Sequence, residues 1–123
     1  FETEGEGEIV IGSHVRINDG CTIVAHQRVT IGDDTLIGEF ASIRDANHGM
    51  ATSALIRMQP NVALPVLIGG NVWIGRGACV LMGACLEDGV VVGANSVVTQ
   101  RISENSIVAG VPARRISNRV DRQ

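Results

Sequence analysis

An aliphatic residue recurs at every sixth position between Ile68 and Thr99. A small or β-branched residue follows four positions later, and Gly or Asn lies immediately before that residue. A helix has a period of 3.6 residues and an alternating strand a period of 2, so neither produces a period of six. The aliphatic positions are Ile68, Ile74, Val80, Leu86, Val92 and Val98, and the Gly or Asn positions are Asn71, Gly77, Gly83, Gly89 and Asn95.

A short strand, a tight turn and another short strand would give this period. Gly and Asn tolerate the left-handed backbone conformation that such a turn requires. If three units close one coil, the aliphatic side chains of successive coils stack inside a prism walled by three parallel sheets. We therefore predict an all-β fold, a parallel β-helix of hexapeptide repeats, as a single domain over residues 1–123. The aromatic content of 2% fits a core that is too narrow for rings.

The same repeat begins earlier in the chain and is interrupted twice. Hexads start at Ile11, Ile17 and Ile23, but the next begins at Ile31, two residues late, which predicts a bulge between Ala25 and Thr30. Residues 1–8 alternate Glu with small residues and predict a frayed acidic edge. Further hexads start at Ile31, Ile37 and Ile43.

Residues 49–67 carry no period and contain two prolines, which predicts a long excursion loop. Its apolar side chains are too numerous for a solvated tether, so we expect the loop to pack on a neighbouring subunit. Residues 112–123 are expected to form a C-terminal cap. Ile116 and Val120 are four positions apart, which indicates a short helix there.

Composition excludes several classes of function. A net charge of −3 and a pI near 5.5 argue against a nucleic-acid partner. All ten basic residues are Arg, so Schiff-base chemistry and a P-loop lysine are excluded. No apolar run approaches the roughly 20 residues of a membrane span, and no signal peptide is visible. Three Cys form an odd set without zinc spacing, with Cys21 in a small inward position. We expect no membrane span, no metal, no disulfide and a cytoplasmic location.

His48 is the candidate general base. It occupies the outward last position of its hexad, where the array is interrupted, with Asp45 and Asn47 close in sequence. An imidazole with a pKa near 6.5 suits proton abstraction at neutral pH. His14 occupies a turn position and is expected at an exposed corner. His26 lies at the predicted bulge, where an exposed corner and a role in lining a site both remain open.

The strings IGGNVWIGRGACVLMGACLEDGVVVGANSVVT and ISENSIVAGVPARRI resemble the hexapeptide-repeat acyltransferases, which have a left-handed β-helix. The closest branch contains the galactoside and maltose O-acetyltransferases and the related xenobiotic acetyltransferases. The resemblance covers about Val15 to Ile116. It implies the left hand of the helix and transfer of acetyl from acetyl-CoA to a hydroxyl.

The resemblance also implies site residues. His48 matches the general base, and Asn18 matches a polar residue near it. The positions that match contacts to CoA are Trp73, Arg76, Ala94, Thr99 and Arg114, with the contact of Arg76 made through the backbone. Arg115 adjoins Arg114, and such a pair suits the 3′-phosphate of CoA. The alternatives are interface packing for Trp73 and a solvated cap for the Arg pair.

The sequence also departs from the family pattern. His26 replaces an acidic acceptor-binding residue of the sugar enzymes, and with Asp45 it is our candidate for acceptor binding. Gln100 replaces a Lys and Ser117 an Arg in the region that grips the CoA phosphates. The N-terminal helical segment of the sugar enzymes is not recognisable.

These observations favour a homotrimeric O-acetyltransferase that uses acetyl-CoA and a sugar or glycan precursor as acceptor. His48 would activate the hydroxyl for direct attack, because no Cys or Ser adjoins it. Five hexads separate the inward positions of Ile17 and Gly49, allowing for the two-residue slip, so Asn18 and His48 should lie on different faces. The alternatives are a γ-carbonic-anhydrase-like zinc enzyme and a non-catalytic scaffold.

Overall fold

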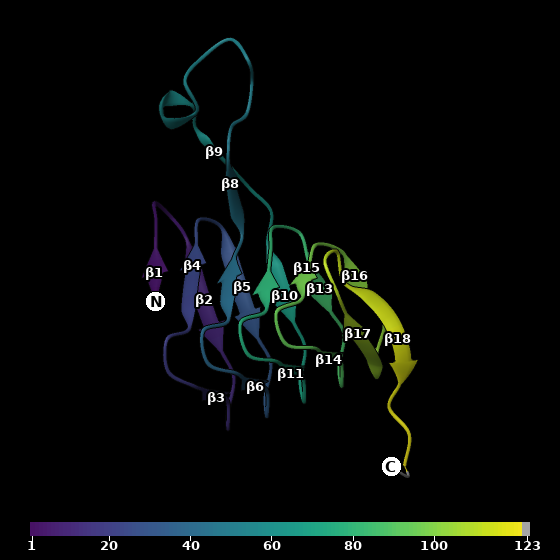
Figure 1. Cartoon of the computed structure of the whole chain (residues 1–123). Coiled ribbons are helices and arrows are strands. Elements are labelled where there is room, and N and C mark those ends of the chain that lie inside the picture. The colour runs from purple at the N-terminus through teal and green to yellow at the C-terminus, as the bar shows by residue number, and fades with distance from the viewer. Residues whose placement is uncertain (122–123) are drawn as a thin grey trace.

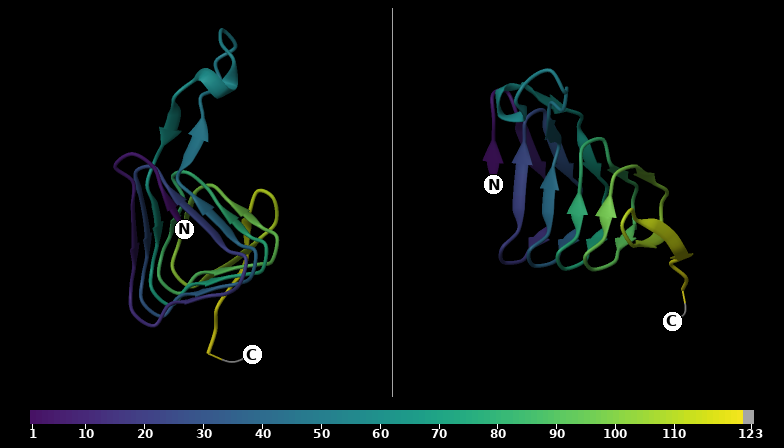
Figure 2. Two further views of the ribbon diagram at one scale, coloured as in Figure 1. Left: turned by 90° about the vertical axis from the view of Figure 1, so that its left-hand side faces the viewer. Right: turned by 45° about the horizontal axis from the view of Figure 1, so that its top comes forward.

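The computed structural model describes residues 1–121 and shows a three-sided parallel β-helix of five coils (Figure 1). Viewed along its axis, the helix has a triangular outline, and one long arm projects from a corner (Figure 2). Each coil contributes one strand to each of three walls, which we call A, B and C.

Strand order in each wall follows the coils from the N-terminus to the C-terminus. Wall A consists of β1 (Glu2–Thr3), β4 (Thr22–Ala25), β7 (Ser42–Arg44), β12 (Cys79–Val80) and β15 (Val97–Val98). Wall B consists of β2 (Glu8–Ile11), β5 (Arg28–Ile31), β10 (Val66–Ile68), β13 (Cys85–Leu86) and β16 (Arg101–Ile102). Wall C consists of β3 (Arg16–Ile17), β6 (Leu36–Ile37), β11 (Trp73–Ile74), β14 (Val91–Val92), β17 (Ser106–Ala109) and the antiparallel β18 (Arg114–Asn118).

The predicted inward positions form the core. The six aliphatic positions between Ile68 and Val98 are at most 2% exposed, and so are the small residues that follow them. The parallel register places aliphatic residues of adjacent coils next to one another. Ile74, for example, pairs with Ile37 and with Val92 in the adjacent coils. Burying one such side chain contributes about 1.5–3 kcal/mol to folding.

The corner prediction is confirmed residue by residue. Asn71, Gly77, Gly83, Gly89 and Asn95 all have positive φ, between 53° and 79°. Hydrogen bonds join the corners of successive coils: the Asn95 amide donates to the Arg76 carbonyl at 2.8 Å. A left-handed residue at each corner therefore lets the chain turn while the backbone pairing between coils continues.

The excursion loop is an ordered arm. Strands β8 (Ala46–His48) and β9 (Asn61–Ala63) pair antiparallel, and a short 3-10 helix, η1 (Ile56–Met58), lies near the tip. The apolar side chains of the arm are 51–73% exposed: Met50, Leu55, Ile56, Met58, Val62 and Leu64.

The predicted end of the loop at residue 67 is wrong. The solenoid resumes at Val66, which pairs with Val29, because Val66 and Ile68 both point inward while Leu67 points out.

The predictions for the two ends need correction. The expected C-terminal helix is replaced by β18, which pairs with β17. All five residues of β18 are exposed, so no apolar helix face would be buried, whereas the open edge of β17 gains backbone partners. Residues 122 and 123 of the predicted cap lie outside the described range. At the other end, Glu2 and Thr3 are not frayed but pair with Val24 and Ala25.

Within residues 1–121, no helix is long and apolar enough to cross a membrane.

Candidate functional site

His48 faces a hollow of about 400 Å³ where wall A turns into wall B. The base of the arm forms one side of the hollow. Coils one and two form the other side, through Glu2, Glu4 and His26. His48 is exposed, and its ring makes no hydrogen bond to any residue within 1–121. The imidazole is therefore free to meet a ligand, and no Cys or Ser lines the hollow.

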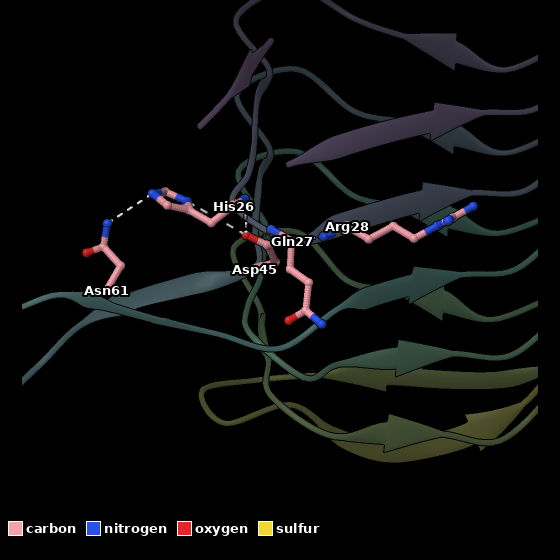
Figure 3. A network of polar contacts seen from close by, with 5 residues as sticks. All are labelled: His26, Gln27, Arg28, Asp45 and Asn61. Carbon is pink, nitrogen blue, oxygen red and sulfur yellow. Dashed lines mark hydrogen bonds and ion pairs between the residues drawn. The ribbon is translucent and has the colours of Figure 1, made fainter. Parts of the chain in front are cut away.

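The buried carboxylate of Asp45 is hydrogen-bonded to the corner that carries His26 (Figure 3). Asp45 is 0% exposed, and both of its oxygens accept backbone N–H groups from the coil below. Oδ1 accepts from His26 at 2.8 Å, and Oδ2 accepts from Gln27 at 2.7 Å and from Arg28 at 2.8 Å. Hydrogen bonds to a charged acceptor contribute about 1.5–3 kcal/mol each. This carboxylate therefore holds the bulged backbone of the two-residue slip between Ala25 and Thr30 in place.

The expected role of Asp45 in acceptor binding changes with this geometry. Its carboxylate offers no surface to solvent, because the corner 26–28 covers it. In this structure Asp45 instead fixes the backbone that carries His26.

His26 joins that corner to the arm. Its Nε2 lies 3.0 Å from Nδ2 of Asn61, which is the register partner of His48 in the arm. His26 Nδ1 is buried, lacks a hydrogen-bond partner among the described residues and lies 3.8 Å from Asp45 Oδ1. If the Asn61 amide donates to Nε2, the ring proton resides on Nδ1 and faces the carboxylate. His26 thus lines the hollow and also ties the base of the arm to the solenoid.

Asn18 lies elsewhere, in a groove along wall C. This groove has a volume of about 470 Å³ and includes Trp73, Arg76 and Ala94 in its lining. Trp73 is 55% exposed on the outer face of β11. Asn18 follows a strand of wall C, whereas His48 follows a strand of wall A, so they lie at different corners. The hexad count predicts this separation.

The remaining residues predicted to contact CoA lie at the C-terminal end of the chain. Gln100, Arg114 and Arg115 line a hollow of about 200 Å³, and Thr99 precedes Gln100 at the exposed corner. Arg115 Nη1 donates to the side chain of Asn118 at 3.3 Å. Ser117 lies beside them in β18. The residues predicted to contact CoA therefore lie in two groups. One group lines the groove on wall C, and the other lies at the C-terminal end.

Two residues of interest were missed from the sequence. Asn61 could not be found, because its contact with His26 depends on the register of the arm. Phe40 could have been found, since it occupies a turn position where Gly or Asn is the rule.

The described part of the chain does not contain a set of ligands for zinc. No group of three His, Cys, Asp or Glu side chains among residues 1–121 converges to hold a metal ion. His14 lies at an exposed corner, where its Nδ1 is 3.7 Å from Asp34 Oδ1. The third ligand that a zinc enzyme needs is not supplied there.

The three cysteines are free. Cys79 and Cys85 lie on walls A and B, as their spacing of one hexad predicts. The Cys21 thiol donates to the Gly38 carbonyl at 3.0 Å, and burial raises its pKa.

Several known proteins are similar to this chain, although no model of a protein family matches it. It is 42% identical over 118 residues to the putative lipopolysaccharide biosynthesis O-acetyl transferase WbbJ of Escherichia coli K12, covering 89% of this chain and 60% of WbbJ. It is 37% identical to the galactoside O-acetyltransferase of E. coli K12, covering 93% of this chain and 56% of that protein.

Solved structures are also similar. A galactoside acetyltransferase in complex with coenzyme A has a TM-score of 0.90 at 35% identity, covering 98% of this chain and 60% of that one. The hexapeptide-repeat acetyltransferase VCA0836 of Vibrio cholerae in complex with acetyl-CoA has a TM-score of 0.86 at 31% identity, covering 98% and 65%. The predicted fold class, a left-handed parallel β-helix of hexapeptide repeats, is thereby confirmed. The chain spans about 60% of the length of the curated relatives it matches.

Proposed function

Since this chain belongs to the hexapeptide-repeat acyltransferases, we propose that it transfers the acetyl group of acetyl-CoA to a hydroxyl of a sugar or glycan precursor. The observation that carries the proposal is the exposed His48 ring at the base of the arm. In that position, an unpartnered imidazole adjoins a polar hollow in which a hydroxyl-bearing ligand would be solvated by amides and charged groups.

The reaction follows from the chemistry of His48. Its ring takes the proton from the acceptor hydroxyl as the oxygen attacks the thioester carbonyl. Backbone N–H groups stabilise the oxyanion of the tetrahedral intermediate. The C–S bond then breaks, and the departing CoA sulfur takes the proton from the imidazolium. We propose direct transfer without an acyl-enzyme, since neither Cys nor Ser lines the hollow beside His48.

The donor is proposed to lie along wall C. The groove past Trp73 and Ala94 suits the thin pantetheine arm of CoA. Arg114 and Arg115 would meet the phosphates at the C-terminal end, where guanidinium groups form charge-assisted hydrogen bonds with phosphate. Gln100 and Thr99 contribute only neutral contacts at this end.

Assembly is proposed to be a homotrimer. Asn18 and His48 lie at different corners of one rigid solenoid, so a site that uses both needs two chains. The apolar side chains of the arm are exposed in the single chain and need a surface to cover them. Three clefts, each joining Asn18 of one chain to His48 of the next, satisfy both requirements. The three free cysteines fit the reducing cytoplasm as the place of this reaction.

One experiment tests the activity. A panel of sugars is offered with acetyl-CoA, and free CoA release is measured. The wild-type protein should release CoA only with an acceptor present, and His48→Ala should not. A non-catalytic scaffold would neither bind acetyl-CoA nor release CoA with any acceptor.

A second experiment tests the shared site. Inactive Asn18→Ala and His48→Ala proteins are unfolded together and reassembled. Mixed trimers should regain part of the activity, because some clefts then contain both native residues. Mixed trimers without any activity would place the site within one chain.

A further inference from the structure

Phe40 breaks the rule that governs the corners. It has φ 61° at the turn between walls C and A, where the other coils place Gly20, Gly77 and Asn95. A bulky residue in the left-handed region is an outlier, because its Cβ crowds the backbone. The residue is also 59% exposed, so its side chain gains little from burial. Such a residue is a candidate for function rather than for folding.

The ring is held in a defined place. It lies over Gly20 of the coil below, since a Cβ on Gly20 would overlap the ring. The Arg76 guanidinium carbon of the coil above is 5.4 Å from the ring centroid, within the range of a cation–π contact. The Phe40 amide donates to the Asp19 carbonyl at 3.0 Å. The coils on both sides therefore hold the ring in place, and the side chain still lines the adjoining hollow, because 59% of the residue is exposed.

The hollow beside the ring has the chemistry of a carbohydrate site. It has a volume of about 490 Å³ and is lined by Ile17, Asn18, Asp19, Glu39 and Phe40. The carboxylates of Asp19 and Glu39 and the amide of Asn18 offer acceptors and donors for hydroxyls, although one oxygen of Glu39, Oε1, also lies 3.6 Å from Arg76 Nε. An aromatic face offers an apolar surface for the C–H face of a pyranose ring. The neighbouring groove, with Trp73, Val91 and Ala94, is more apolar and suits a thin chain instead. Asn18 borders both spaces.

We propose that Phe40 is a stacking platform for the sugar ring of the acceptor, with Asp19 and Glu39 receiving its hydroxyls. This inference rests on the proposed function, of which it names a subsite. In the proposed trimer, His48 of the adjacent chain closes the same cleft, so a ring on Phe40 would present a hydroxyl to that base.

The test is Phe40→Asn. Asn95 occupies the same turn position at φ 59°, so Asn suits the backbone there and removes only the ring. We expect kcat/KM for sugar acceptors to fall roughly 3- to 10-fold, the range for one aromatic contact. The KM for acetyl-CoA and the oligomeric state should not change, and the melting temperature should stay equal or rise. Phe40→Tyr keeps the ring face and should retain activity within about twofold.

Several outcomes would overturn the platform. They are an unchanged kcat/KM for sugars, an equal rise in the KM for acetyl-CoA, or dissociation of the oligomer in Phe40→Asn. The last two would assign the ring to the donor or to a subunit contact.

Saturation-transfer NMR with methyl glycosides separates this inference from the proposed function, because it needs no turnover. Glycoside signals that depend on Phe40, without acetylation of any sugar, would refute the proposed function and keep the platform. If the wild type acetylates sugars and its glycoside signals persist in Phe40→Asn, the platform fails and the function stands. No signal and no acetylation would refute both.

Discussion

Asp45→Asn should destabilise the protein strongly, although it changes one oxygen to an amide nitrogen. The native carboxylate is fully buried and accepts three backbone N–H groups from the corner at His26, Gln27 and Arg28. The single oxygen of Asn can serve the two donors that now share Oδ2. Its NH₂ group then faces the His26 N–H, so two donors meet without an acceptor.

The magnitude follows from these contacts. Leaving a buried donor unsatisfied costs about 1–3 kcal/mol, and the two remaining bonds lose charge assistance worth about 1 kcal/mol each. The sum is about 3–5 kcal/mol, which is a large share of the 5–15 kcal/mol that typically stabilises a domain. For a chain of this size the melting temperature should fall by about 10 °C or more.

Asp33→Asn is the matched control. Asp33 Oδ1 also accepts a corner amide, from Ser13 at 2.8 Å, but it accepts only one and its residue is exposed. This substitution should cost about 1 kcal/mol or less, since water can replace the partner.

Urea unfolding followed by circular dichroism measures both variants. Equal costs for Asp45→Asn and Asp33→Asn would refute the reasoning, because burial and the number of donors would then not matter. Asp45→Asn should also lower turnover more than Asp33→Asn does, since the corner that it supports holds Asn61 at the base of the arm through His26.

Three further predictions concern His48, the Arg pair and Cys21. His48→Ala should lower kcat by roughly 10²- to 10⁴-fold with little change in CoA affinity; calorimetry with CoA and a turnover assay check this, and near wild-type turnover would remove His48 from catalysis. Arg114→Ala with Arg115→Ala should weaken acetyl-CoA more than 3′-dephospho-acetyl-CoA, whereas equal losses would mean that the pair only caps the solenoid. Burial raises the pKa of Cys21, so its neutral thiol favours the folded state below the unfolded pKa, and this contribution is lost as pH rises through the folded value. Thermal unfolding above about pH 8 should therefore show a steeper loss of stability in the wild type than in Cys21→Ala, and parallel curves would contradict it.

The repeating part of this fold is predictable because each local signal agrees with the global one. Asn71 and Gly89 lie at corners and have a left-handed backbone, and Ile74 and Leu86 lie in the core. The six-residue period therefore predicts both the corners and the core. The arm is not periodic, and the pairing of His48 with Asn61 depends on the register of a hairpin that no residue pattern specifies. The end at β18 was mispredicted because Ile116 and Val120 suit a helix by spacing, whereas the edge of β17 supplies partners for a strand.

The sequence proposes which residues belong to the candidate site and determines only part of their arrangement. Sequence spacing places Asn18 and His48 at different corners, since a rigid repeat converts residue number into position. Sequence spacing does not reveal that Asp45 faces inward. Its orientation depends on backbone amides of the coil below, which bulge toward its carboxylate.

The arm also bears on how the third coil closes. At the corner between walls A and B, coil two uses only His26 and Gln27, whereas coil three sends the chain out through residues 45–65 before β10 pairs with β5. Roughly three doublings in the length of a flexible connection would add about 2 kcal/mol of ring-closure entropy. Pairing of β8 with β9 joins the two ends of the excursion at its base, so the solenoid closes across a much shorter effective loop. The number of residues near the tip of the arm, beyond His48 and Asn61, can therefore vary with little effect on the entropy cost of closing the third coil.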